Sequence, residues 1–442
     1  MGAEGAHYRS VVGLIAEIKS YFLLERVDVS LMQFNYSLCV LCRGRGLCGL
    51  AYCPVIARSR AMVKLRRVYN SNIIEGSTPP SVFVGRVGYP YVRVGPSTPP
   101  VRGNTSIFDY PEAWSSLRVE DVLEYRWSLV TGYSVVDVRR HESRVLEEMR
   151  LLTLSAKPID VQVVLEKKPK PVLLLSEYEP PQGPRAPLNS LRVLGNPSVP
   201  RPLERVYSDT NLSAADAVLY LYEAGIPVSH IQKVFSVGAL GLKGQRRLVP
   251  TRWSITAVDS IICKSLIREI KKYEPVNEIL VYEHRVHDNL FAAILYPAKW
   301  SYEWMEAWWP GSTWNPGGLE VVVEGSHEDY FGRTTYPEIG GCYYASMLAT
   351  LEHLKSIRRQ ATAVLLREIY PGFNIPIGVW FVRESCRVMF KKGPVLRTSS
   401  LREVCEYLDK TTRLGCRKWF SSSRLLSRIY STKRIEEFLR RE

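Results

Sequence analysis

The sequence has 442 residues, of which 46% are hydrophobic and 11% aromatic, a composition that excludes a disordered chain and indicates a substantial core. It holds 59 lysines and arginines against 44 aspartates and glutamates, and the net charge of +15 favours a polyanionic partner, meaning nucleic acid or an acidic surface. No uncharged apolar run reaches the ~18 residues of a membrane-spanning helix, so a transmembrane helix is excluded and no membrane partner is expected.

The length exceeds what one compact core usually supports, so we expect an α+β protein of two domains. The expected segments are an N-terminal helix and cysteine motif (1–60), the rest of the first domain (61–275), a C-terminal α+β domain (276–424) and a basic C-terminal helix (425–442). The stretch from Arg397 to Glu442 carries +6 of the +15. A well-solvated charged surface is the alternative explanation of this excess.

The N-terminal residues lack the features of a secretion signal. There is no basic lead, and Glu17 and Lys19 interrupt the apolar stretch from Ile15 to Leu24. The odd number of cysteines favours a reducing compartment. We therefore expect a cytoplasmic protein.

A first helix is predicted over Val11–Leu24, and four closely spaced cysteines follow it. Their spacing is C-x2-C-x5-C-x4-C, and the four are Cys39, Cys42, Cys48 and Cys53. Intervening glycines let the chain fold back, and four thiolates form the closed tetrahedral set of structural zinc. An iron–sulfur cluster and a pair of disulfides are the alternatives. The remaining five cysteines are scattered and suggest no second cluster.

A glycine- and proline-rich segment, VFVGRVGYPYVRVGP, predicts a short hairpin. Its strands are Val82–Val84 and Tyr91–Val94, joined at Gly88–Pro90. Glycines allow a close backbone approach to a phosphate, and Arg86 and Arg93 lie within the same segment. The hypothesis is a phosphate-contacting site, and the alternative is a hairpin that is merely kinked by glycines.

The rest of the first domain is predicted to be mixed. The expected elements are helices at 119–130, 142–154, 213–224 and 256–273 and a strand at 160–165. Ser213 is suited to cap its helix and Gly225 to end it. Residues 167–202 contain nine prolines, which predicts a long loop without regular structure.

The second domain is predicted to contain strands at 278–284, 290–296 and 319–324, a long helix at 340–369, a β-rich run at 375–383 and helices at 400–408 and 425–439. Trp300, Trp304 and Trp308 have the spacing of one helix face. That face could stack unpaired bases, but an aromatic stripe of this kind is more often core.

Two clusters of acids and histidines suggest an enzymatic alternative. His284 and Asp288 lie in VYEHRVHDN, and His327 and Asp329 lie in EGSHEDYFG. If they converge, they would suit Mg²⁺ or Mn²⁺ and phosphodiester cleavage. The ordinary alternative is surface turns that follow strands. Two arginine pairs, Arg246–Arg247 and Arg358–Arg359, are further candidates for contacts with a nucleic-acid backbone.

The order of motifs resembles the archaeal Nre family of DNA-repair proteins. The motifs are CVLCRGRGLCGLAYCP, FVGRVGYPYVRVGP, NLFAAILYPAKWSYEWMEAW, RRQATAVLLREIYPGF and GVWFVRE, and the resemblance extends from Met32 to Glu384. It implies a cytoplasmic archaeal protein in the response to DNA damage, with a zinc-bearing N-terminal domain, a C-terminal domain and a terminal peptide that binds the sliding clamp, PCNA.

The clamp-binding peptide departs from its pattern of a glutamine, an aliphatic residue and two aromatics. In TKRIEEFL, Ile435 and Phe438 fit, but Thr432 replaces the glutamine and Leu439 an aromatic residue. We expect weak clamp binding, and a helix packed on its own domain is the alternative. The leading hypothesis is a DNA-binding repair protein with structural zinc. The alternatives are a metal-dependent nuclease acting on repair intermediates and a non-catalytic adaptor that recruits repair factors to the clamp.

Overall fold

The computed structural model describes residues 70–139, 143–170, 182–373 and 375–431, together with residues 53, 56 and 59. Several predicted features lie outside the described residues: the helix at 11–24, Cys39, Cys42 and Cys48 of the zinc motif, and the clamp peptide at 432–439. The structure does not test them.

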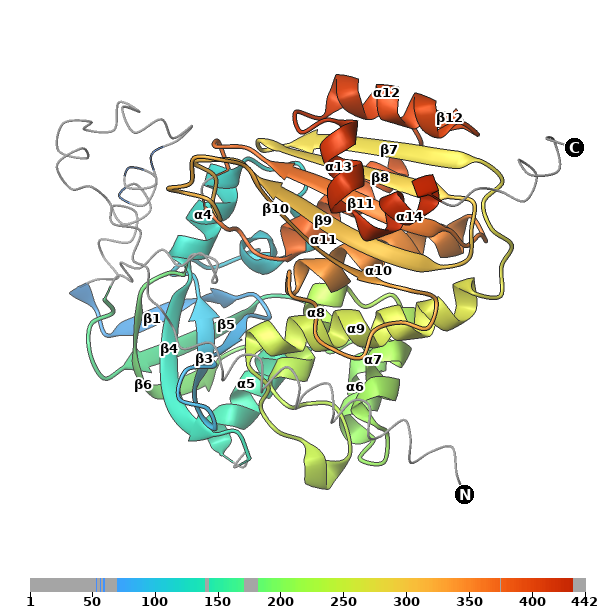
Figure 1. Cartoon of the computed structure of the whole chain (residues 1–442). Helices are drawn as coiled ribbons and strands as arrows, with labels where there is room; N and C mark the ends of the chain where they lie inside the picture. Colours follow the sequence, from blue (N-terminus) through green and yellow to red (C-terminus); the bar gives the residue numbers. More distant parts are fainter. Residues whose placement is uncertain are drawn as a thin grey trace, which may run out of the picture. The chain divides into compact units, whose positions relative to one another are not determined.

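The chain divides into two compact units, each considered on its own. The first unit includes Tyr52–Ile262 and Pro376–Trp380, and the second includes Cys263–Ile375 and Phe381–Glu442. The division falls inside helix α9 (Thr251–Ile270), whereas the sequence analysis placed the domain change near residue 275. The α+β class is confirmed, since each unit combines a six-stranded sheet with helices (Figure 1).

The sheet of the first unit has the order β1-β5-β6-β4-β3-β2, and only β4 and β6 pair in parallel. Its strands are β1 (Ile73–Thr78), β2 (Val82–Val84), β3 (Tyr91–Thr98), β4 (Val130–Asp137), β5 (Ile159–Leu165) and β6 (Arg185–Val193). The sheet is strongly curved. The backbone N–H of Ser77, on β1, donates to the carbonyl of Val101, which lies just past the end of β3. The predicted hairpin and the predicted strand at 160–165 are confirmed.

Strand β6 corrects the prediction of a structureless loop over 167–202. Pro187 lies beyond the last β5–β6 pair, Leu165 with Leu188, and past the register shift that skips Asn189. The carbonyl of Pro187 still accepts a hydrogen bond from the N–H of Glu166.

The described helices of the first unit include the four that were predicted and two that were not, at 201–208 and 228–236. They are α4 (Val119–Ser128), α5 (Arg144–Leu154), α6 (Arg201–Ser208), α7 (Ala214–Glu223), α8 (Val228–Ser236) and the first part of α9, with short 3-10 turns at Ser106–Asp109, Pro111–Ala113 and Lys243–Gln245. The Ser213 hydroxyl accepts from the N–H of Asp216, which confirms the predicted cap. Gly225 follows the helix with φ +77°, a left-handed conformation that suits glycine.

The sheet of the second unit has the order β10-β9-β11-β8-β7-β12, and only β9 and β11 pair in parallel. Its strands are β7 (Ile279–Val286), β8 (Asn289–Tyr296), β9 (Ser301–Trp308), β10 (Val322–Glu328), β11 (Thr362–Ile369) and β12 (Leu396–Thr398). Its helices are α10 (Cys342–Ser356), α11 (Trp380–Lys391), α12 (Leu401–Thr411), α13 (Cys416–Ser422) and α14 (Arg424–Ser431).

Helices cover both faces of this second sheet (Figure 1). On one face, aliphatic residues such as Val281 and Ile294 share a core with Val404 of α12, Trp419 of α13 and Leu425 of α14. On the other face, aromatic rings dominate the packing. Tyr282 meets Phe390 of α11, and Tyr302 meets Tyr343 of α10, at centroid distances of 5.0 and 5.1 Å. A disulfide between Cys405 and Cys416 joins α12 to α13, a pairing that the scattered spacing did not suggest.

Three predictions for the second unit were wrong, and all three concern apolar segments. The tryptophans at 300–308 lie on or next to strand β9 instead of on a helix, although the prediction that they are core is confirmed for Trp300 and Trp304. The helix predicted over 340–369 ends at Ser356, because the backbone turns at Arg358 (φ +52°), and the remainder is β11. The β-rich run at 375–383 instead leads into α11. A buried run without alternation fits a helix or a strand equally well.

Candidate nucleic-acid interface

The hairpin of β2 and β3 places Arg86 in its turn and Arg93 on its second strand. The N–H of Gly85 donates to the carbonyl of Arg93, and Gly88 adopts φ +86° in the turn. Gly95 of β3 crosses β4 so closely that a Cβ added there would lie 1.6 Å from the carbonyl oxygen of Gly132. Glycine at this crossing holds β3 and β4 together as a tight pair.

The solvent-facing side of this strand pair carries aromatic and apolar side chains beside an arginine. Strand β3 alternates over its first four residues, with Val92 and Val94 buried and Tyr91 and Arg93 exposed. On β4, Val135 lies directly opposite Arg93. We call Tyr91, Arg93, Tyr133 and Val135 the β3–β4 face.

Two of its residues already interact. The guanidinium of Arg93 lies 5.0 Å from the centroid of the Tyr133 ring, a cation–π distance. Tyr91 and Val135 are each 60% exposed. The face therefore combines one positive charge with apolar and aromatic area that water reaches.

Charged residues border the face on one side. Asp137 is the cross-strand neighbour of Tyr91, and Arg139 forms an ion pair with it at 3.6 Å. Arg86 lies in the adjacent turn, next to Val87, which is 80% exposed. Arginines outnumber carboxylates along this edge of the sheet.

Arg246, another predicted contact, is engaged within its own unit. Its guanidinium donates to the carbonyls of Gly241 at 2.8 Å and Asp209 at 3.0 Å and lies over the ring of Tyr207. Burial lowers the pKa of Arg246. These contacts assign it a structural role in holding the loop after α8, while its neighbour Arg247 is exposed.

The other predicted arginine pair belongs to the second unit. Arg358 and Arg359 follow the last turn of α10, where the N–H groups of both residues donate to helix carbonyls. Arg358 is exposed and Arg359 is partly buried. The pair remains accessible to a polyanion on the surface of that unit.

The acid-and-histidine clusters do not converge. His284 lies on β7 and Asp288 in the turn after it, while His327 lies on β10 and Asp329 just beyond. Strands β8, β11 and β9 separate β7 from β10. Within the ranges that the structure describes, no group of three His, Cys, Asp or Glu residues is placed to hold a metal ion.

Two members of these clusters contact basic side chains of the second unit. The Nδ1 of His284 lies 2.9 Å from Nζ of Lys392, and burial, with the charge of Lys392, lowers the pKa of His284 to about 4. Asp329 forms an ion pair with Arg428 of α14. This geometry gives no support to the nuclease alternative.

A pocket at the end of β10 was not foreseen. It is lined by Gly325, Ser326, His327, Glu328, Asp329, Gly332, Arg333, Thr334, Thr335 and Glu338. Its polar groups largely satisfy one another: Arg333 donates to the carbonyls of His327 and Thr335 and to Glu338. The pocket is thus organised by contacts within its own loop.

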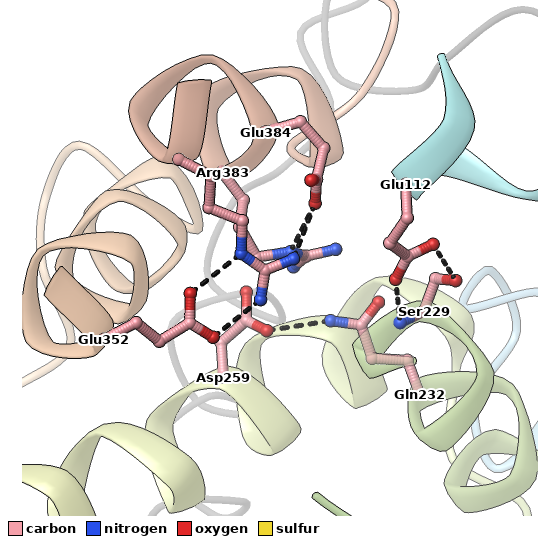
Figure 2. Close-up of polar contacts among 8 residues, drawn as sticks. Glu112, Ser229, Gln232, Asp259, Glu352, Arg383 and Glu384 are labelled. Atoms are coloured by element: carbon pink, nitrogen blue, oxygen red, sulfur yellow. Dashed lines mark hydrogen bonds and ion pairs between the residues drawn. The ribbon is translucent and has the colours of Figure 1, made fainter. Parts of the chain in front are cut away.

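Sequence reasoning also missed a set of buried and partly buried polar contacts (Figure 2). In the first unit, Glu112 accepts from the N–H and the hydroxyl of Ser229 at 2.9 and 2.7 Å, and Gln232 donates to Asp259 at 2.8 Å. Separately, in the second unit, Glu352 pairs with Arg387 at 2.7 Å, and Arg383 pairs with Glu384 at 3.4 Å. No local sequence signal identifies such partners, because most lie far apart along the chain.

These observations define an α+β protein of two units, one of which presents an arginine- and tyrosine-bearing sheet face to solvent. In the described part of the chain, no helix is long and apolar enough to cross a membrane. Family profiles described as "Archaeal Nre, N-terminal" and "Archaeal Nre, C-terminal" match residues 47–315 and 328–438. The chain belongs to the archaeal Nre family.

Named relatives agree with this assignment. The chain is 48% identical to the DNA repair protein NreB of Archaeoglobus fulgidus, over 88% of this chain and 97% of the relative. It is 36% identical to DNA repair protein NreA of the same organism, over 86% and 93% of the two chains. It is also 36% identical to NreA of Haloferax volcanii, over 75% and 82%. No solved structure matches this chain.

Proposed function

We propose that this protein acts in archaeal DNA repair by binding DNA. The observation that carries the proposal is the 48% identity, over nearly the whole length, to a protein named for DNA repair. The net charge of +15 and the exposed arginines of both units supply the electrostatic basis for contact with phosphates.

The salt dependence of DNA binding tests this proposal. The full chain is titrated against labelled duplex and single-stranded DNA of mixed sequence, and the logarithm of the affinity should fall linearly with the logarithm of salt, by ~0.7 to 0.9 per phosphate contact. Arg358→Glu combined with Arg359→Glu should weaken binding. The control, Arg102→Glu with Arg118→Glu, reverses two exposed charges elsewhere. Absence of binding at low salt would refute the proposal.

We also propose a structural zinc ion bound by Cys39, Cys42, Cys48 and Cys53. The support is the spacing of the four thiols, which suits a closed tetrahedral site. Elemental analysis of the purified protein should give one zinc per chain, and Cys48→Ser should release it and lower stability. Cys342→Ser, at a partly exposed cysteine that begins helix α10, is the control. Purified protein without zinc would contradict the site.

A weak interaction of the tail with the archaeal sliding clamp is the third proposal. Ile435, Phe438 and Leu439 supply three apolar side chains at helical spacing, but Thr432 cannot replace the glutamine amide. Loss of one hydrogen bond of ~1 kcal/mol predicts several-fold weaker binding than for a full motif. A synthetic peptide of residues 432–442 should bind with micromolar affinity and lose binding with Phe438→Ala. No binding at millimolar peptide would exclude the interaction.

A further inference from the structure

We propose that the β3–β4 face binds single-stranded DNA, with an unpaired base stacked on Tyr91 and the backbone contacted by Arg93. This inference rests on the proposed DNA binding and adds the form of the DNA and the residues that receive it. The sequence placed the two arginines in a hairpin, but the aromatic partners became apparent only from the pairing of β3 with β4.

The residues form one continuous patch because of the strand register. Tyr91 and Arg93 are two residues apart on β3, so their side chains leave the same side of the sheet about 6.8 Å apart. Val135 stands opposite Arg93, and Tyr133 lies diagonally across from it, near enough for its ring to meet the guanidinium. Val87, in the turn just before β3, is 80% exposed.

The exposure of this patch is not explained by folding. In a sheet with one solvated face, the outward positions are normally polar. Here Tyr91, Val135 and Val87 stay 60–80% exposed while the alternate residues Val92 and Val94 are fully buried. An exposed apolar area bordered by charge is typical of a binding surface.

The chemistry of the patch selects an anionic and aromatic ligand. Among the described residues, the guanidinium of Arg93 lies over the Tyr133 ring, and Asp137, opposite Tyr91, forms its ion pair with Arg139. The ring holds the guanidinium in place and leaves its N–H groups able to donate to a phosphate. The tyrosine ring of Tyr91 offers a surface on which any base can stack.

An unpaired strand fits this surface better than a duplex does. In a duplex both faces of each base are stacked on neighbouring bases, so an aromatic side chain on a sheet gains nothing from them without disrupting the helix. Unstacked bases of a single strand are available, and base–aromatic stacking makes a large contribution that depends little on sequence. A duplex would use the arginines alone through its phosphates.

The experiment compares binding of the full chain to labelled oligothymidine and to a duplex of equal length. Tyr91→Leu removes the ring and keeps the apolar area, so affinity for the single strand should fall about tenfold and affinity for the duplex less than about twofold. Tyr91→Phe should bind as the parent does. Tyr430→Leu, at a tyrosine that is 74% exposed on α14, is the matched control and should have no effect. Arg93→Gln should weaken both ligands.

A spectroscopic measurement reports stacking directly. Fluorescence of a 2-aminopurine base within the single strand should be quenched on binding to the parent protein and much less on binding to Tyr91→Leu. If DNA binds but neither Tyr91→Leu nor Arg93→Gln weakens the single-strand complex, this inference is refuted and the proposed function stands. If no DNA binds at low salt, the proposed function itself fails. Tighter binding of an RNA of matched sequence would refute the assignment to DNA.

Discussion

The two sheets contain equal numbers of strands but use their charged side chains in opposite ways. In the first unit, the first half of β3 alternates, and Tyr91 and Arg93 are exposed to solvent. In the second unit, β11 is buried along its whole length, and its Arg367 is only 1% exposed. Arginine on the open sheet faces water and is available to a ligand, whereas arginine in the covered sheet must find every partner inside the protein.

Arg367 satisfies its charge through several buried partners. Its guanidinium donates to Glu306 at 3.0 Å and to Asn289 at 2.9 Å, and four aromatic rings lie within 5.6 Å of it. Glu306 also accepts from the indole N–H groups of Trp304 and Trp308. Replacing any single member of this network should destabilise the protein, because the remaining members stay buried without their partner.

The largest effect is therefore expected at Arg367. Arg367→Met strands the carboxylate of Glu306 in the core and should lower the free energy of unfolding by about 3–5 kcal/mol. Adding Glu306→Leu should restore part of the loss, because no unpaired buried carboxylate then remains at this position. Chemical denaturation provides the measurement. Arg402→Met, which breaks an exposed pair with Glu406, is the control and should cost less than about 1 kcal/mol. If Arg367→Met and Arg402→Met lowered the free energy of unfolding equally, the contrast between buried and exposed arginines would be wrong.

The second prediction concerns His230 in the first unit. Burial lowers the pKa of this histidine to about 4, and its Nε2 lies 2.6 Å from the carbonyl of Thr153. The unfolded chain, with a histidine pKa near 6.5, takes up the proton first, so stability is complete above pH ~6.5 and falls as pH drops toward 4. The loss across this window should reach about 3 kcal/mol.

Replacing the titrating group tests that assignment. His230→Gln keeps a hydrogen-bond donor toward Thr153 but cannot take up a proton. The pH dependence of unfolding between 6.5 and 4 should therefore become shallower by the contribution of His230, while that of His284, whose pKa is also lowered to about 4, remains. Denaturation curves at several pH values in this window measure the change. His327→Gln, for which burial is only partial, serves as the control. An unchanged slope in His230→Gln would assign the acid sensitivity to other groups.

Sequence reasoning succeeded where a local signal determines the backbone. Glycine and proline identified the hairpin that holds Arg86 and Arg93, and Ser213 identified a helix start. It failed where tertiary pairing decides. The apolar run of β11 and the proline-bearing β6 became strands only because neighbours distant in sequence pair with them.

The candidate site divides in the same way. Its arginines could be predicted, but Tyr91, Tyr133 and Val135 could not, because their exposure depends on the register of β3 against β4. The acid-and-histidine clusters illustrate the converse: similar motifs in one domain lie on strands that the topology keeps apart.

A third prediction concerns a carboxylate of the covered sheet that anchors a helix. Glu303 of β9 is buried and accepts from the hydroxyl of Ser423 and from the N–H groups of Arg424 and Leu425 at the start of α14. Glu303→Gln removes the charge that favours this helix N-terminus and should cost about 1–2 kcal/mol in chemical denaturation. Glu406→Gln, on the exposed side of α12, should cost less than about 0.5 kcal/mol. If Glu303→Gln left the free energy of unfolding unchanged, packing alone would hold α14 in place.

The smallest effect on the free energy of unfolding is expected at Arg93. This position gives the most direct comparison between an exposed and a buried arginine. Its cation–π contact with Tyr133 is exposed, and contacts of this kind contribute about 0.5–1 kcal/mol. Arg93→Gln should therefore lower the free energy of unfolding by no more than that amount, and in a double-mutant cycle with Tyr133→Leu the coupling should account for most of the change. Arg367→Met, measured in the same denaturant series, should exceed it several-fold. If Arg93→Gln destabilised the protein as much as Arg367→Met does, the β3–β4 face would be a structural surface, and its arginine would not be available to DNA.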